Sequence, residues 1–243
     1  MVIDHSYKIS AFGDFSDITP NADTMMYFFE KLKDLGLLPS VFQELQIKAD
    51  GAPPVTQQRI ALLSNDGREK VSIASGRIDY EITAKSDEKL EPAYRQQLNT
   101  KICKVFELIF DKFIKKSSRL ALNTASFVIN LSDDEITEFM SHYSNPISLY
   151  SETPLDEWST RLMVRKTEHI LEPEEKINVI TNLSKAALQK QVDGEFVHST
   201  GFAVNVDINT VPENTIQRYS ATDLACFVNI AVGWWDKIIA EMG

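Results

Sequence analysis

Two long segments with helical periodicity, separated by shorter segments with strand periodicity, constrain the fold of this chain more than any other feature. Apolar side chains recur every three or four residues through 98–113 and again through 222–242, a spacing that places them on one face of an α-helix. Elsewhere apolar and polar residues alternate with period two, which is typical of strands with one buried and one solvated face. The pattern predicts an α+β fold in which a curved, mainly antiparallel sheet packs against long helices.

The order of these segments repeats along the chain. Each half runs strand, helix, several strands and long helix, and the second half follows the first at an offset of about 110 residues. We therefore predict two similar halves, 1–116 and 117–243, each a curved sheet packed on its own long helix. The alternative is that the two sheets fuse into a single domain.

Local signals predict several element boundaries. Gly36 is expected to end the first helix, because glycine readily adopts the left-handed conformation of a helix C-terminus. Asp66-Gly67 predicts a tight hairpin turn. Ser132 followed by Glu135 is a capping box, which predicts a helix start. The predicted strands are 7–12, 41–47, 59–63, 69–74, 77–83, 119–131, 158–167, 176–183 and 201–208.

Charge and hydropathy argue against several classes of protein. The 243 residues include 25 Lys+Arg and 35 Asp+Glu, a formal net charge of −10. Nucleic acid is an unexpected partner, because binding it requires a basic face, and acidic residues interrupt the basic positions between Lys101 and Arg119. No segment has the roughly 18 consecutive apolar residues of a membrane span, and the first residues lack the pattern of a signal peptide. We predict a cytoplasmic protein that does not enter the membrane.

The sequence contains none of the common motifs for catalysis or cofactor binding. Its four histidines and two cysteines lack metal-ligand spacing. Its nine glycines form neither a Walker loop nor a dinucleotide-binding fingerprint. The sequence therefore predicts no metal site and no cofactor, and it favours a non-catalytic protein while leaving catalysis open.

The most distinctive polar pattern lies near the end of the last predicted strand. Asn205, Asp207 and Asn209 alternate with aliphatic residues, so their side chains are expected on one face of the sheet. This row either contacts a ligand or a cation, or is the solvated face of an antiparallel sheet, which is the more common arrangement. With Tyr80 from an earlier strand, Asn205 and Asp207 are candidates to line a cavity between the sheet and a long helix.

Trp234 and Trp235 form a second candidate site. Adjacent residues of a helix point about 100° apart, so both cannot face the core. One is predicted to be buried, and the other either caps the sheet edge or forms an exposed contact for a protein partner. The apolar residues at 25–29 pose a similar question, because burial on two sides there implies a second protomer.

Four short motifs carry a resemblance to a known family. They are Pro53–Val55, the strand 59–63 with its Asp66-Gly67 turn, the strand 119–123, and the strand 204–207 before the closing aromatic helix. In these motifs the chain resembles an uncharacterised, sporadically distributed bacterial family of about this length. It departs from the family pattern at Ala121, where a glycine is common. The resemblance implies no known catalytic residues.

Two classes of function are consistent with these observations. The leading hypothesis is a non-catalytic interaction or regulatory protein of a bacterial system, such as phage defence or toxin control, with a protein partner or a second copy of itself. The alternative is a small-molecule-binding protein or hydrolase that uses a cavity between sheet and long helix. Nucleic-acid binding ranks third, because it requires the Lys101–Arg119 charges to join Arg161, Arg165 and Lys166 on one face.

Overall fold

A computed structural model describes residues 2–47, 53–84, 90, 92–144, 155, 157–172, 174–192 and 195–242. The first part of the chain forms β1 (Val2–Phe12), α1 (Ala22–Leu32), a 3-10 helix η1 (Lys33–Leu35), β2 (Leu37–Gln46), β3 (Val55–Ser64), β4 (Glu69–Ile73), β5 (Arg77–Thr83) and α2 (Pro92–Phe113). The second part forms β6 (Arg119–Ile129), α3 (Asp133–Tyr143), β7 (Ser159–Glu168), β8 (Glu175–Val192), β9 (Glu195–Thr210) and α4 (Ala221–Met242).

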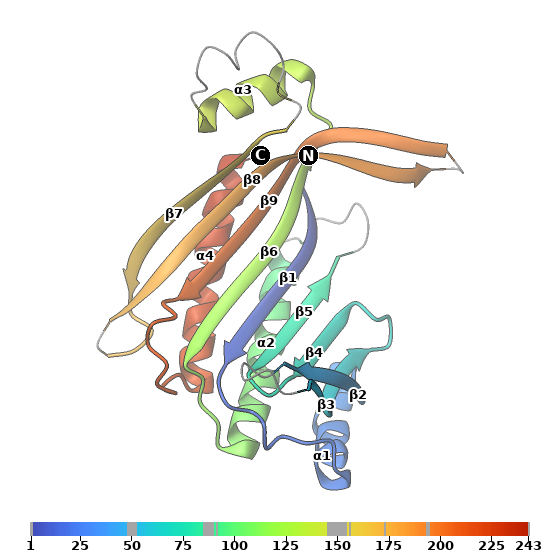
Figure 1. The fold of residues 1–243 in the computed structure, drawn as a ribbon, viewed down its shortest axis with the longest axis vertical. Coiled ribbons are helices and arrows are strands. Elements are labelled where there is room, and N and C mark those ends of the chain that lie inside the picture. The colour runs from blue at the N-terminus through green and yellow to red at the C-terminus, as the bar shows by residue number, and fades with distance from the viewer. Residues whose placement is uncertain are drawn as a thin grey trace.

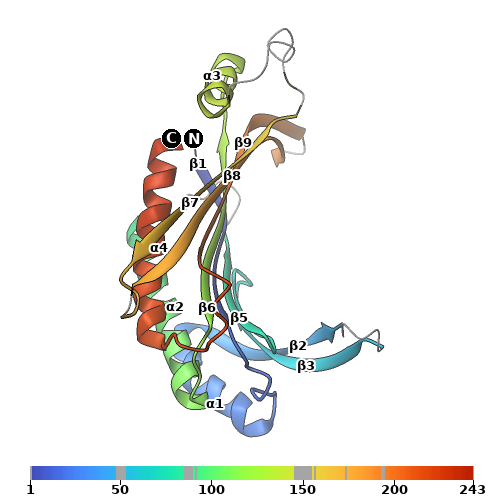
Figure 2. The same ribbon diagram turned by 60° about the vertical axis from the view of Figure 1, so that its left-hand side comes forward.

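The nine described strands form one antiparallel sheet in the order β2-β3-β4-β5-β1-β6-β9-β8-β7. The long helices α2 and α4 lie on the same face of this sheet (Figures 1 and 2). The prediction of an α+β fold with mainly antiparallel strands is therefore confirmed. Within the described residues, no helix is long and apolar enough to cross a membrane.

The two parts of the chain join at the centre of the sheet. Strands β1 and β6 pair from Val2 opposite Val128 to Phe12 opposite Arg119. The first strand of each part also pairs with the last strand of that same part, β1 with β5 and β6 with β9. The arrangement is one continuous sheet rather than two separate sheets, with five strands from the first part and four from the second.

The local boundary signals are present in the structure. Gly36 has a φ of 73° at the end of η1, which is the left-handed conformation expected of it. Ser132 and Glu135 form the predicted capping box at the start of α3. Gly67, in the turn between β3 and β4, also has a positive φ of 72°.

The hydrophobic core lies between the sheet and the two long helices. Ile9 of β1, Leu122 of β6 and Val206 of β9 are fully or almost fully buried there, in one cluster with Phe106 of α2 and Phe227 of α4. Burial of each such side chain contributes roughly 1.5–3 kcal/mol. Period-two alternation then places the intervening residues of the same strands on the opposite face.

That opposite face is concave. Figure 2 shows α2 and α4 on one side of the sheet, while the β2–β3 hairpin and the far part of the β8–β9 hairpin project on the other side. Neither long helix covers this side (Figure 1). We refer to it as the concave face.

The β8–β9 hairpin is longer than the sequence pattern predicts. Its residues remain paired as far as Val192 opposite Glu195, well beyond the predicted strands 176–183 and 201–208. Gly201 lies where β9 leaves its partner β6, and a Cβ atom there would come within 1.9 Å of the Val128 carbonyl oxygen. The close approach of the two backbones explains the glycine.

Candidate functional site

The concave face carries a polar hollow at the centre of the sheet. Its volume is about 390 Å³. Polar side chains from five neighbouring strands line it: Lys8, Glu81, Asn123, Asn182, Asn205 and Asp207. We call this site the hollow.

Strand register brings these side chains together in two adjacent rows across the sheet. In the first row Glu81 is opposite Lys8, Lys8 is opposite Asn123, and Asn123 is opposite Asp207. In the second row Ala125 is opposite Asn205, and Asn205 is opposite Asn182. Side chains of directly opposed residues on one face lie roughly 4.5–5.5 Å apart at Cβ.

The carboxamides of the hollow have unused hydrogen-bonding capacity. Each asparagine side chain has two N–H donors and an acceptor oxygen. Within the part of the chain that the structure describes, Asn123, Asn182 and Asn205 form no side-chain hydrogen bond, and Lys8 and Glu81 form no ion pair. Their donors and acceptors therefore point to solvent or to a ligand.

A second asparagine pair on the same strands differs in this respect. Asn178 of β8 is opposite Asn209 of β9, and these residues are only 5% and 1% exposed. The Nδ2 of Asn178 donates to the Oδ1 of Asn209 at 3.2 Å, and the Nδ2 of Asn209 donates to the Oδ1 of Asp207 at 2.9 Å. The Nε of Arg165 donates to Asn178 Oδ1 at 2.9 Å. This chain of bonds holds Asp207 at the margin of the hollow.

An aromatic side chain lies next to the hollow. Phe127 is two residues beyond Ala125 on β6, so both side chains are on the concave face. Its ring centroid is 5.8 Å from that of His5, at an interplanar angle of 66°. A β-bulge between Asp4 and Ser6 shifts the register of β1 at His5, and such bulges redirect side chains.

The charges of the hollow argue against an anionic ligand. One cation, Lys8, faces two anions, Glu81 and Asp207, in a chain of net charge −10. The described residues contain no group of three or more His, Cys, Asp or Glu side chains that could hold a metal ion. The chemistry that these side chains offer is hydrogen bonding with nearly balanced charge.

The predicted combination of Tyr80 with Asn205 and Asp207 is wrong. Tyr80 is fully buried in the core on the helix-covered face, and its hydroxyl donates to Glu69. Burial, together with that hydrogen bond, raises the pKa of Tyr80 well above its ordinary value. Asn205 and Asp207 lie on the concave face, because alternation along a strand sends neighbouring positions to opposite faces.

The tandem tryptophans divide as the helix geometry requires. Trp235 is 1% exposed and belongs to the core. Trp234 is partly exposed, and its Nε1 donates to the Oε1 of Glu168 at 3.0 Å. The ammonium groups of Lys166 and Lys237 lie 5.2 and 4.4 Å from the centroid of its ring. Trp234 therefore lies beside the β7 edge of the sheet, in contact with Glu168 and Lys166.

Sequence reasoning did not group Lys8, Asn123 and Asn182 with Asn205. Each is a polar position in an alternating strand, and that alternation was their only local signal. Their proximity depends on the strand order β5-β1-β6-β9-β8, which joins residues far apart in the chain.

Comparisons with known proteins gave no family for this chain. No protein-family model, no curated protein and no solved structure matches it.

Proposed function

We propose that this protein is a binding protein whose hollow takes a neutral, polyhydroxylated small molecule of the saccharide class. The observation that carries the proposal is the cross-strand pair Asn182–Asn205, which lies in the hollow with Asn123 nearby and forms no side-chain hydrogen bond with the described residues. Carboxamides placed together in a hollow are well suited to a ligand that supplies the missing partners.

The ligand class follows from the chemistry of the lining. A carboxamide can donate to one hydroxyl and accept from its neighbour, which matches the adjacent hydroxyl groups of a sugar. One cation, Lys8, against two anions, Glu81 and Asp207, favours a neutral molecule over an anionic one. The aromatic residue Phe127 lies on the same concave face two residues beyond Ala125, and the C–H side of a sugar can stack on such a ring.

The size of the hollow supports the same class. Small-molecule sites usually measure roughly 300–1,000 Å³, and about 390 Å³ lies at the lower end of that range. A hydrogen bond fixes part of the lining, since the Nδ2 of Asn209 donates to the Oδ1 of Asp207. A partly preorganised lining reduces the entropy that binding would cost.

Calorimetric titration tests this proposal. The probes are a panel of neutral mono- and disaccharides, with glucuronate, glucosamine and glucose 6-phosphate as charged counterparts. We expect saturable binding of at least one neutral sugar, and a loss of about tenfold or more in affinity for Asn182→Ala and Asn205→Ala. Asn229→Ala, which removes an exposed carboxamide from α4 on the other side of the molecule, is the matched control. Binding confined to charged probes, or an equal loss in the control, would contradict the proposal.

The proposal keeps the sequence-based idea of a small-molecule site and moves it from the sheet–helix interface to the concave face. An interaction or regulatory role in a bacterial system, and a cytoplasmic location, stay predictions from the sequence. We also propose that 1–116 and 117–243 are structural repeats. Their shared order of strand, helix, strands and long helix, with first and last strands paired in each, supports this.

A further inference from the structure

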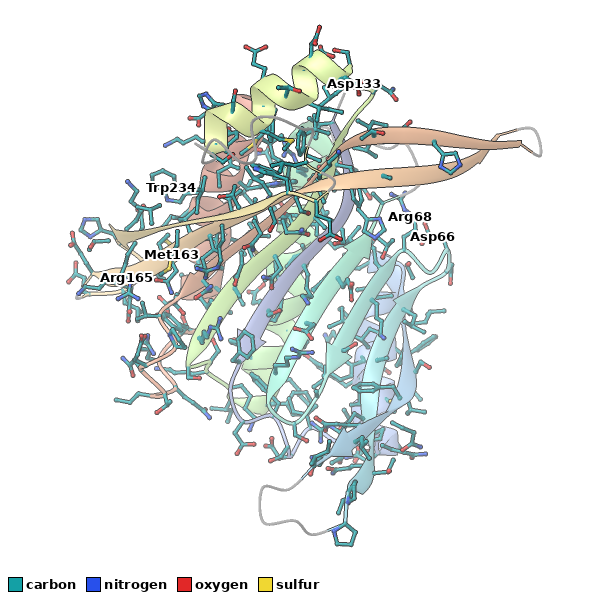
Figure 3. The ribbon with its side chains drawn as sticks, turned by 45° about the horizontal axis from the view of Figure 1, so that its top comes forward. Asp66, Arg68, Asp133, Met163, Arg165 and Trp234 are labelled. Atoms are coloured by element: carbon teal, nitrogen blue, oxygen red, sulfur yellow. The ribbon has the colours of Figure 1, made fainter. Side chains whose placement is uncertain are left out.

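Strand β7 is an edge of the sheet with an exposed apolar centre. It is last in the strand order and pairs only with β8 among the described strands. Its outer margin therefore presents backbone N–H and C=O groups without a strand partner in the described structure. Leu162, Met163 and Val164 are 43%, 47% and 45% exposed. Figure 3 shows Met163 and Arg165 along this margin.

The opposite edge of the sheet is protected differently. Strand β2 contains Pro39, which has no backbone N–H to offer a further strand. Its charged residue Glu44 is already bonded, because it accepts from the hydroxyl of Ser75 at 2.6 Å. Strand β7 has neither proline nor glycine, and it pairs with β8 through all ten of its residues without a shift in register. Strand β2 also exposes apolar side chains, Val41 at 47% and Leu45 at 60%. Of the two edges, β7 is the one without a proline to interrupt pairing with another strand.

Charge and alternation give the β7 edge two distinct faces. Arg161 and Arg165 lie opposite Asn182 and Asn178 of β8, so their side chains share the concave face, with Met163 between them. Leu162 and Val164 share the other face. A basic face and an apolar face therefore run along one free edge, in a chain whose net charge is −10.

We propose that the β7 edge binds an extended segment of a partner protein as an additional strand, and that this segment alternates acidic with apolar residues. Its acidic side chains would face Arg161 and Arg165, its apolar side chains would face Leu162 and Val164, and its backbone would pair with that of β7. A second copy of this chain fits less well in the register centred on Met163. Antiparallel pairing of two β7 strands about Met163 sets Arg161 of each copy opposite Arg165 of the other, and like charges in that position repel.

This inference does not rest on the saccharide site, because the outer margin of β7 and its exposed side chains carry it. The two sites are nevertheless neighbours, since Arg161 is opposite Asn182 of the hollow and Arg165 is bonded to Asn178. Fluorescence anisotropy with a labelled peptide of alternating glutamate and valine tests it. A peptide with lysine in place of glutamate tests the charge. Two further peptides, N-methylated at odd or at even positions, test the backbone pairing. We expect the glutamate peptide to bind saturably, the lysine peptide not to bind, and one of the two methylated peptides to lose binding, since alternate amides of an added strand point to β7.

Variants of the full chain distinguish binding at the β7 edge from non-specific electrostatic attraction to the protein. Arg161→Glu with Arg165→Glu should weaken the glutamate peptide by about tenfold or more. Lys31→Glu with Lys116→Glu makes the same change in net charge at two exposed lysines away from β7, and it should change affinity by less than about twofold. Leu162→Ser with Val164→Ser should weaken binding without changing its salt dependence.

Several results would overturn the inference. They are the absence of saturable binding of the glutamate peptide, equal binding of both methylated peptides, and an equal loss in the Lys31/Lys116 control. A dimer seen by light scattering that Arg161→Glu with Arg165→Glu disrupts would also overturn it, because the occupant of the edge would then be a second copy.

Discussion

Strands β8 and β9 carry two asparagine pairs on the same face, four residues apart, and the two pairs differ in nearly every physical respect. Asn178 and Asn209 are buried and joined by a 3.2 Å hydrogen bond. Asn182 and Asn205 have the same cross-strand relation, yet Asn205 is exposed, Asn182 is half-buried, and neither has a side-chain partner in the described structure. The same residue type in the same cross-strand relation therefore has different surroundings in the two pairs.

This difference distinguishes polar side chains that stabilise a sheet from polar side chains that are available to bind a ligand. A buried carboxamide must satisfy its donors and acceptor within the protein, because leaving one unpaired costs about 1–3 kcal/mol. An exposed carboxamide is satisfied by water and exchanges that water for a ligand at little cost. The first pair should therefore control stability, and the second should control binding.

The largest effect is expected from disrupting β9, which carries one asparagine of each pair. Gly201→Ala places a Cβ atom 1.9 Å from the Val128 carbonyl oxygen, so the backbones of β6 and β9 must separate. We expect a loss of about 3 kcal/mol in the free energy of unfolding, measured by urea denaturation. Gly233→Ala is the control: nothing lies within 4 Å of its added Cβ, and it should stabilise α4 by about 0.5–1 kcal/mol. Equal stability of the two variants would contradict the prediction, because it would show that the pairing of β6 with β9 tolerates a Cβ atom at position 201.

The next largest effect is expected from the buried pair. Asn209→Ala leaves the Asn178 amide without its acceptor and removes a donor from Asp207, so we expect a loss of about 2 kcal/mol. A double-mutant cycle with Asn178→Ala should give a coupling energy of about 1 kcal/mol. Urea denaturation of the unmodified protein, the two single variants and the double variant measures this coupling energy. Purely additive losses would mean that the hydrogen bond between Asn178 and Asn209 contributes no stability of its own.

The smallest effect on stability is expected from the exposed pair. Asn182→Ala and Asn205→Ala remove no hydrogen bond of the described structure, so the free energy of unfolding should change by less than about 0.5 kcal/mol. The same variants should lose sugar affinity, as proposed above. If they destabilise the protein as much as Asn209→Ala does, the two pairs are equivalent and the hollow is a structural feature.

Much of the local structure could be predicted from the sequence because its causes are local. The left-handed glycine at Gly36 and the capping box of Ser132 with Glu135 depend on neighbours within a few residues. Alternation also predicted that Asn205, Asp207 and Asn209 share a face. The extension of the β8–β9 hairpin lacked such a signal, because backbone pairing continues there beyond the strongly alternating apolar residues.

The candidate site was less predictable because it depends on sheet order. Lys8 and Asn123 are far apart in the chain and become neighbours when β1 pairs with β6. Tyr80 was assigned to the wrong surroundings for a related reason. Its strand was correctly read as having one buried face, but the sequence does not tell whether a cavity lies on that side, and the structure buries Tyr80 in the packed core.

We propose that the hollow, and not the buried pair beside it, binds a neutral saccharide. Two-dimensional ¹H–¹⁵N spectra of the asparagine side-chain amides test it directly during titration with a neutral sugar that binds. We expect saturable shifts for Asn123, Asn182 and Asn205, with Asn178 and Asn209 nearly unmoved. Shifts confined to the buried pair or to the α2 and α4 side of the sheet, or no shift at any asparagine, would contradict it.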